Sequence, residues 1–265
     1  MPNSRSHRFA LPLTLAVLAL VLTACGGGVA YPNSTFNSTT EVNDLSTHLW
    51  DKLLFWGTVV FVIVEAILLY TIIRYRRKDG APDPEQVHGN TALEITWTVI
   101  PVLILALIAV PTVETIFKTQ AKAPADALEV EVIGHQWWWE FRYPSLGVTT
   151  ANELYLPAGK TVNFSLQTKD VLHSFWVPQL GGKRDLISNH TNHIWYTPKD
   201  SLAMSVFNGF CVEYCGASHA NMRFRAYVVS PTDFEAWAAH NADMAMMRDP
   251  EPAAAPAATA PAAKP

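Results

Sequence analysis

Hydrophobic residues along the chain first form three long runs near the N-terminus and then short segments that alternate with polar positions. The first run, FALPLTLAVLALVLTA at residues 9–24, follows the basic residues Arg5 and Arg8. It is shorter than the roughly 20 residues that a membrane-spanning helix needs. A basic start followed by a short apolar run is typical of a secretory signal. We therefore predict that residues 1–24 are a signal peptide.

The end of this signal resembles a bacterial lipobox, because 22-LTAC-25 is followed by three glycines. The resemblance implies a lipoprotein-type signal and lipidation of Cys25 as the first residue of the mature chain. An ordinary signal peptide with an incidental Cys25 is the alternative. In either case the mature N-terminus is exported, and we expect the polar residues 25–48 to form a solvated linker.

The second and third runs, at residues 49–75 and 93–118, are long enough to cross a membrane as helices. A basic cluster lies at the end of the second run and directly after it: Arg74, Arg76, Arg77 and Lys78. Since basic residues accumulate in cytoplasmic loops, we place the loop at residues 76–92 in the cytoplasm. Everything after residue 118 then lies on the outer side of the membrane.

Composition agrees with a membrane subunit rather than with a nucleic-acid-binding protein. Hydrophobic residues make up 49% of the chain and charged residues 16%, and the formal net charge is −4. Glu65 lies in the middle of the first span, where a charge is costly, so we expect it to face protein rather than lipid. A packing role is favoured for Glu65 over a proton relay. Two spans with one such acid indicate a subunit that has membrane partners.

From about residue 125 the pattern changes to short segments in which apolar and polar positions alternate. They are separated by turn signals such as Pro144 and 157-PAG-159. Short strands at this spacing predict an all-β domain, a sandwich or barrel, over residues 125–240. The clearest predicted strands are 128–134, 161–168, 193–198 and 224–230. A short amphipathic helix is expected near 231–241, and the Ala/Pro-rich residues 241–265 are predicted to form a disordered tail.

The segment 210-FCVEYCGASHANMRF-224 holds two cysteines, a histidine and a methionine within a dozen residues. In an exported domain, Cys211 and Cys215 could form a disulfide. Cysteine and histidine could also bind zinc. A disulfide leaves both His219 and Met222 unexplained, and zinc has little need of a thioether, so we consider both alternatives less suitable than copper.

Copper accounts for every one of these residues. Blue-copper sites combine two histidines, one thiolate and a weak axial methionine in a β-sandwich, and one histidine comes from upstream. The candidate ligands are His173, in the upstream segment 170-DVLHSFWVP-178, and Cys211, Cys215, His219 and Met222 in the loop. Both thiolates can bridge two copper ions, with the backbone carbonyl of Glu213 as a second weak ligand. No position is left for a substrate, so we predict electron transfer rather than catalysis.

The loop resembles the dinuclear copper A motif, C-x-E-x-C-x-x-x-H-x-x-M, of subunit II of the haem–copper cytochrome c oxidases. The two spans, the segment 134-GHQWWWEF-141 and the segment DVLHSFWVP extend the resemblance over about residues 49–240. It implies a membrane-anchored all-β protein, in which a two-helix transmembrane hairpin precedes a cupredoxin-like domain. It also implies the function of a respiratory subunit II. Such a subunit accepts electrons from cytochrome c and passes them to haem in subunit I, where oxygen is reduced to water with proton translocation.

The resemblance also implies a role for individual residues. The implied ligands of the two coppers are His173, Cys211, Glu213, Cys215, His219 and Met222. The Glu213 side chain would help to hold a magnesium ion at the subunit I interface. Trp137 would take up electrons from cytochrome c; since strand side chains alternate, at least one of the three consecutive tryptophans should lie at the surface. Glu94, in 92-ALEITWTVIP-101, would lie at the mouth of a proton-uptake route, and a role as an interfacial acid is equally favoured.

The sequence departs from the family pattern at a few positions. They are Trp138, where tyrosine is usual, Ser188, Asn189 and His190, where Pro-Gly-Arg is usual, and Asn221 and Arg223 beside the methionine. All ligand positions remain filled, so these departures concern donor docking and subunit contacts. For His190 and His193 we expect ordinary surface positions.

Other functions are compatible with parts of the sequence. A quinol oxidase subunit II would lack the copper ligands, which are all present here. A membrane-anchored copper chaperone would need neither the tryptophan run nor Glu94, and the copper A subunit of a nitric-oxide reductase would carry the same loop. The favoured prediction is an oxidase subunit of the bacterial inner membrane, with the copper domain on the periplasmic side and haem only in the partner subunit.

Overall fold

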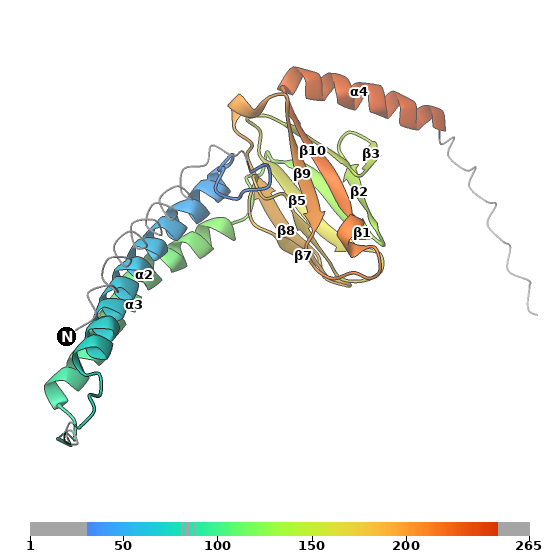
Figure 1. The fold of residues 1–265 in the computed structure, drawn as a ribbon. Helices are drawn as coiled ribbons and strands as arrows, with labels where there is room; N and C mark the ends of the chain where they lie inside the picture. The colour runs from blue at the N-terminus through green and yellow to red at the C-terminus, as the bar shows by residue number, and fades with distance from the viewer. Residues whose placement is uncertain (1–30, 81, 83–84, 87, 249–265) are drawn as a thin grey trace, which may run out of the picture. The chain divides into compact units, whose positions relative to one another are not determined.

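The computed structural model describes residues 31–80, 82, 85–86 and 88–248 (Figure 1). The predicted signal peptide at residues 1–24, Cys25 and residues 249–265 lie outside the described residues. The described part consists of two long helices, a β-sheet domain and a C-terminal helix.

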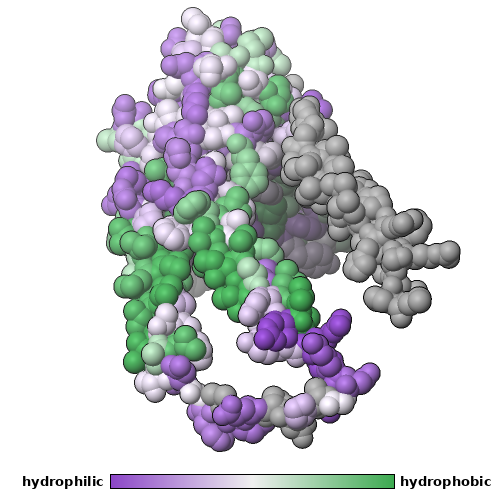
Figure 2. Space-filling view, turned by 60° about the vertical axis from the view of Figure 1, so that its left-hand side comes forward, coloured by the Kyte–Doolittle hydropathy of each residue, from purple (hydrophilic) through white to green (hydrophobic). Residues whose placement is uncertain are grey.

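The two predicted spans form helix α2, Glu41–Arg74, and helix α3, Thr91–Thr119, with 34 and 29 residues. Both are long and apolar enough to cross a membrane, and the apolar windows are not buried within the described chain. Figure 2 shows hydrophobic side chains gathered over these helices. Pro101 and Pro111 lie inside α3, as membrane helices tolerate. This surface needs lipid or other protein to cover it.

Helix α2 begins at Glu41, before the apolar run, so the predicted linker at residues 25–48 is wrong for residues 41–48. The N-cap is Thr40, whose hydroxyl accepts a hydrogen bond from the Asn43 N–H at 3.2 Å. Such a cap satisfies one of the free N–H groups in the first helical turn.

The β-sheet domain holds the start of α2 in place. The hydroxyls of Thr39 and Thr40 donate hydrogen bonds to the carbonyls of Gln179 and Leu180. Thr40 is fully buried. Asn43, in the first turn of α2, is also buried and donates to the Gln179 carbonyl at 3.0 Å, so contacts with the domain explain why the helix begins inside the predicted linker.

Two five-stranded sheets form the domain and confirm the predicted β-sandwich. The first contains, in spatial order, β3 (Val148–Ala151), β2 (Trp138–Tyr143), β1 (Leu128–His135), β5 (Val162–Thr168) and β8 (Asn192–Tyr196). The second contains β4 (Glu153–Pro157), β10 (Arg223–Val229), β9 (Ser205–Cys211), β6 (His173–Trp176) and β7 (Arg184–Leu186). The pairs β1–β5 and β4–β10 are parallel, and the other pairs are antiparallel.

An aromatic core lies between the sheets. Phe164, Phe175 and Trp139 are fully buried, and the ring centroids of Phe164 and Phe175 lie 5.5 Å apart. Trp139 packs edge-on against Phe175 at 5.8 Å. Alternation along each strand sends one set of side chains into this core and the other set outward. The core thus makes a rigid support for the loops at its ends.

Helix α4, Pro231–Arg248, packs against the edge of the domain through Phe234 and Trp237. The Trp237 indole stacks on the Tyr155 ring, with centroids 4.4 Å apart. The predicted disordered tail at residues 241–265 is therefore wrong for residues 241–248. Alanine and methionine are frequent there, and both favour helices.

Candidate metal centre

The cysteine loop connects β9 to β10 and is closed at its base. Cys211 is the last residue of β9, and Met222 directly precedes β10. The Cys211 N–H donates to the Met222 carbonyl at 3.0 Å, so the first and last ligand candidates of the loop are neighbours. A short 3₁₀ helix, η2 (His219–Asn221), carries the histidine between them.

His173 reaches the same place from β6, which pairs with β9. Its imidazole is fully buried. Gly134 of β1 lies against this ring, and a Cβ atom at that position would lie 2.7 Å from His173 Cδ2. Only a glycine leaves room for the imidazole in this orientation.

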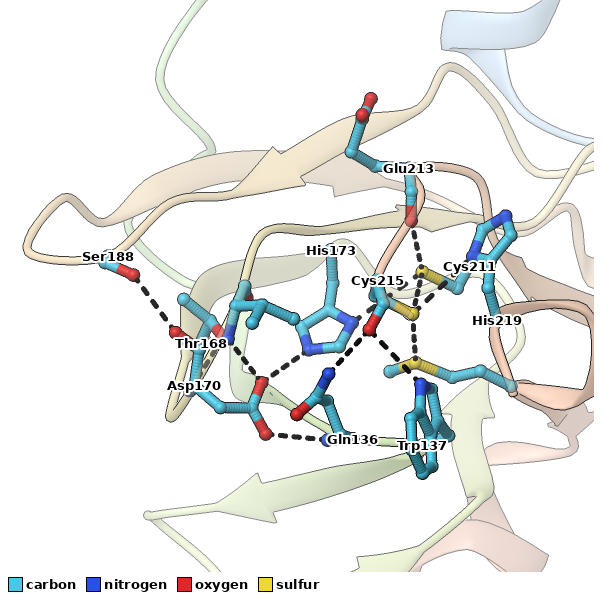
Figure 3. A network of polar contacts seen from close by, with 12 residues as sticks. Gln136, Trp137, Thr168, Asp170, His173, Ser188, Cys211, Glu213, Cys215 and His219 are labelled. Atoms are coloured by element: carbon cyan, nitrogen blue, oxygen red, sulfur yellow. Dashed lines mark hydrogen bonds and ion pairs between the residues drawn. The ribbon is translucent and has the colours of Figure 1, made fainter. Parts of the chain in front are cut away.

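Six candidate donor atoms converge in the folded chain (Figure 3). The Cys211 Sγ lies 3.8 Å from the Cys215 Sγ, 3.8 Å from His173 Nδ1 and 3.3 Å from the Glu213 carbonyl oxygen. The Cys215 Sγ lies 3.5 Å from His219 Nδ1 and 3.7 Å from the Met222 Sδ. Each imidazole is thus adjacent to a different sulfur.

This donor set fits copper. The two thiols are free, and their separation of 3.8 Å far exceeds the roughly 2.05 Å of a disulfide bond. It is shorter than roughly 4.6 Å, twice a typical metal–thiolate distance of about 2.3 Å, so one metal ion can bind both sulfurs. His173, Cys211 and Cys215 are buried and have ligand atoms within 4.8 Å of one another. Soft sulfur with imidazole is the ligand combination of copper electron-transfer sites.

The two thiols differ in acidity. Burial by itself raises the pKa of the Cys211 thiol, but hydrogen bonds with His173 and with the backbone of Ser174 and Glu213 outweigh burial and lower this pKa to about 6. Burial and the neighbouring Cys211 charge raise the pKa of Cys215 to about 12. Near neutral pH the metal-free pair therefore carries one negative charge, and metal binding to both sulfurs must release the second proton.

Asp170 orients the buried histidine. Its Oδ1 lies 2.8 Å from His173 Nε2, and its Oδ2 accepts the Gln136 N–H at 2.7 Å. Burial raises the pKa of the Asp170 carboxyl, but the hydrogen bonds from His173, Gln136 and Val171 outweigh burial and lower it. A carboxylate on one imidazole nitrogen directs the other nitrogen to the metal, here toward Cys211.

Trp137 is hydrogen-bonded to the backbone of a ligand candidate. Its indole Nε1–H donates to the Cys215 carbonyl at 3.2 Å, and the Gln136 Nε2–H donates to the same carbonyl at 2.7 Å. Gly216 follows with a φ of +120°, and a Cβ atom there would lie 3.0 Å from Gln136 Nε2. Both the backbone conformation and the close approach require glycine here.

Strand alternation separates Trp138 from Trp139, while Trp137 lies in the turn that precedes β2. Trp137 and Trp138 are 38% and 36% exposed, whereas Trp139 is fully buried in the core.

The Glu213 carboxylate points away from the sulfur atoms, while its carbonyl faces Cys211 (Figure 3). Glu94 lies exposed in the first turn of α3, on a different element from the cluster.

Two residues of this site were missed in the sequence. Asp170 precedes His173 by three residues, and Gln136 directly precedes Trp137. Both lie inside the motifs that indicated copper. Polar residues adjacent to ligand candidates were the available signal, but the partners of Gln136 lie 34 and 79 positions away.

Comparison with known proteins follows the same division of the chain. Residues 33–115 match the family described as the transmembrane domain of cytochrome c oxidase subunit II, and residues 145–229 match its periplasmic domain. The cytochrome c oxidase subunit 2 of Alkalihalophilus pseudofirmus is 39% identical over 234 residues, which cover 85% of this chain and 66% of that protein. That of Bacillus subtilis is 37% identical over 240 residues, which cover 86% of this chain and 67% of that protein. This chain belongs to the cytochrome c oxidase subunit II family.

The chain spans about two thirds of the length of these two subunit II relatives. Among solved structures, the periplasmic domain of subunit II of cytochrome oxidase of Bradyrhizobium japonicum is 27% identical, with a TM-score of 0.43. That match covers 46% of this chain and 99% of the solved chain.

Membership in the subunit II family confirms the resemblance and the fold class predicted from the sequence, an apolar two-helix hairpin followed by a cupredoxin-like β-sandwich. The chain is a membrane protein with an extracellular domain. The His173–Cys211–Cys215 cluster supplies ligands for the copper centre that this family implies. The copper chaperone and nitric-oxide reductase alternatives are not favoured.

Proposed function

We propose that this chain is the electron-accepting subunit of a respiratory cytochrome c oxidase in the bacterial inner membrane. It takes single electrons from cytochrome c on the outer side, holds them at a dinuclear copper A centre and passes them to haem in subunit I. Oxygen is reduced to water there, with proton translocation. The observation that carries this proposal is the convergence of two thiols, two imidazoles, a thioether and a carbonyl at one end of the domain.

The pairing of each imidazole with a different sulfur supports a centre of two ions. The residues that would hold the two ions are Cys211, Cys215, His173 and His219, with the Met222 thioether and the Glu213 carbonyl as weaker ligands. When bound, two coppers that share two thiolates supply an electron store whose geometry changes little on reduction. The protein contributes burial and a closed loop, which keep the donors in place.

Trp137 is our candidate for electron uptake. Trp137 is partly exposed, and its indole N–H is hydrogen-bonded to the carbonyl of Cys215. The residue therefore joins the protein surface to the backbone of a copper ligand through one side chain. An electron from a docked donor has a continuous path of covalent bonds and one hydrogen bond to the centre.

Further assignments belong to the same proposal. The Glu213 carboxylate, which faces away from the sulfurs, would help to bind magnesium at the subunit I interface. Glu94, exposed in the first turn of α3, would mark the mouth of a proton-uptake route on the cytoplasmic side, next to the basic loop between the two spans. Cys25 would carry a lipid after removal of residues 1–24, and residues 125–240 would form the copper domain.

Purification of the full-length protein from its host membranes tests this function. We expect two coppers per chain, the absorption spectrum of a thiolate-bridged copper pair, a haem-containing polytopic partner, and oxygen uptake driven by reduced cytochrome c. One copper per chain that exchanges readily with a chelator, and no haem, would indicate a chaperone instead. A purified complex that reduces nitric oxide but not oxygen would indicate a nitric-oxide reductase.

A further inference from the structure

The turn that carries Trp137 contains only two residues. His135, the last residue of β1, pairs with Trp138, the first residue of β2, so the turn consists of Gln136 and Trp137. Cross-strand side-chain pairs stabilise antiparallel strands, and this pair directly closes the turn. The geometry of His135 and Trp138 therefore bears directly on the placement of the Trp137 indole.

His135 and Trp138 form a closely stacked pair. Their ring centroids lie 4.2 Å apart and their planes differ by 6°. The imidazole Nε2 of His135 lies 2.8 Å from Glu140 Oε2, and Arg142 Nε donates to Glu140 Oε1 at 2.6 Å. The chain of contacts Trp138–His135–Glu140–Arg142 is called here the outer clamp.

The outer clamp lies on one face of the hairpin. Trp138, Glu140 and Arg142 alternate along β2 with residues of the core face, such as the fully buried Trp139. Glu140 is largely buried. Burial raises the pKa of its carboxyl, but hydrogen bonds with His135 and Arg142 outweigh burial and lower it. A fixed carboxylate between two basic groups holds the imidazole in one plane.

The turn has a second attachment on its inner side. The Gln136 N–H donates to Asp170, and the Gln136 amide donates to the Cys215 carbonyl. These bonds fix Gln136, whereas the Trp137 indole has a single hydrogen bond, to the same carbonyl. A half-exposed indole with one hydrogen bond needs support from the other end of the turn.

We propose that His135, held by Glu140 and Arg142, is a positioning residue for electron uptake. By stacking on Trp138 it keeps the turn in the conformation that places the Trp137 indole N–H on the Cys215 carbonyl. The inference rests on the proposed function and deepens it, since it names residues that support the electron-uptake site. It also gives a role to Trp138, a position at which this chain departs from the family pattern.

The kinetic test uses the complete oxidase complex with reduced cytochrome c. His135→Ala removes both the stack and the contact with Glu140, and we expect kcat to fall roughly tenfold to a hundredfold, the size of effect that a misplacement of about 1 Å can cause. Copper content and absorption spectrum should stay unchanged, and KM should change far less than kcat. His135→Phe keeps a stacking ring and should restore part of the rate.

Trp138→Leu removes the other ring of the stack and should reproduce the loss of kcat, so the proposal does not depend on one variant. The matched control is Tyr227→Ala, which removes a ring stacked on Tyr155 at 4.8 Å in the second sheet. This control should leave kcat unchanged. If His135→Ala and Trp138→Leu keep the wild-type kcat, the positioning role is overturned.

A second readout needs neither copper nor the partner subunit. In the copper-free full-length chain with ¹⁵N-labelled tryptophan, the Trp137 indole N–H should be protected from exchange by its hydrogen bond. His135→Ala should abolish this protection, and Tyr227→Ala should preserve it. Unchanged protection in His135→Ala overturns the positioning role on its own. Failure of the wild-type complex to oxidise cytochrome c counts instead against the proposed function.

Discussion

The two apolar helices and the β-sheet domain use hydrophobic residues in opposite ways. On α2 and α3 most large apolar side chains are exposed, for example Leu107 at 60%. In the domain the corresponding residues, such as Phe164, are fully buried. The helices satisfy their backbone hydrogen bonds locally and leave packing to lipid and partners. The domain packs its own core and can therefore hold a preformed metal site.

The largest effect should follow from removal of one of the two thiols of the proposed copper centre. Cys215→Ser replaces the sulfur that lies within 3.8 Å of three other ligand candidates by a harder oxygen donor. We expect nearly complete loss of the copper A spectrum and of cytochrome c oxidation, with both helices still inserted in the membrane. Copper content and oxygen uptake of the purified complex measure it. A variant with two coppers and wild-type turnover would contradict the ligand assignment.

The contrast in packing can be tested with one truncation in each region. Phe164→Ala removes a ring that packs against Phe175 and Tyr196, and should lower the free energy of unfolding of the domain by about 3–5 kcal/mol. Leu107→Ala, on the exposed surface of α3, should change it little in detergent. Urea unfolding followed by tryptophan fluorescence gives both values. Equal losses in the two variants would show that the helices depend on a packed core as well.

Alanine substitutions at Gly134 and Gly182 compare a position in contact with a metal ligand candidate with a position that has free space. Gly134→Ala places a methyl group against the His173 ring and should lower copper affinity by roughly 10- to 100-fold, as for other changes around metal ligands. Gly182→Ala is the control, because nothing lies within 4 Å of a Cβ atom there. Competition with a copper chelator measures both affinities. Equal affinities in the two variants would show that the His173 ring tolerates the methyl group.

The smallest expected effect is the pH dependence of copper affinity, which follows from the protons released on binding. The Cys211 pKa is lowered to about 6 and the Cys215 pKa is raised to about 12. Above about pH 7, copper binding to both sulfurs should release about one proton, so apparent affinity should rise about tenfold per pH unit. Below pH 6 the Cys211 thiol is protonated too, and the decline of affinity with falling pH should steepen. Calorimetry in buffers of different ionisation enthalpy counts the protons; no release at pH 8 would contradict the assignment.

Much of the site could be predicted because most of its ligand candidates lie close together in the sequence and are of residue types that bind copper. Cys211, Cys215, His219 and Met222 lie in one loop, and copper is the metal that needs all of them. His173 could be chosen from a short segment upstream. Asp170 and Gln136 could not be chosen, since aspartate and glutamine are common on surfaces. Gln136 bonds to residues 34 and 79 positions away, and the sequence does not show that the Asp170 carboxylate turns toward the nearby His173.

The start of α2 also could not be predicted from the local sequence. The apolar run beginning near residue 49 marks the membrane part of α2, but the helix starts at Glu41 because buried threonines bond to Gln179 and Leu180. Those residues lie about 140 positions away in the chain. No local pattern reports a partner at that distance.

The sequence by itself determined the two spans, the β-sandwich and the ligand types, because hydrophobic period and donor chemistry are local properties of a chain. Tertiary structure alone decided which imidazole nitrogen faces which sulfur, how Asp170 and Gln136 join the site, and how His135 stacks on Trp138. The sequence separations of these contacts vary, but each depends on the exact approach of side chains after the sheets have packed. Packing in three dimensions sets such approaches to within an ångström, and residue order does not.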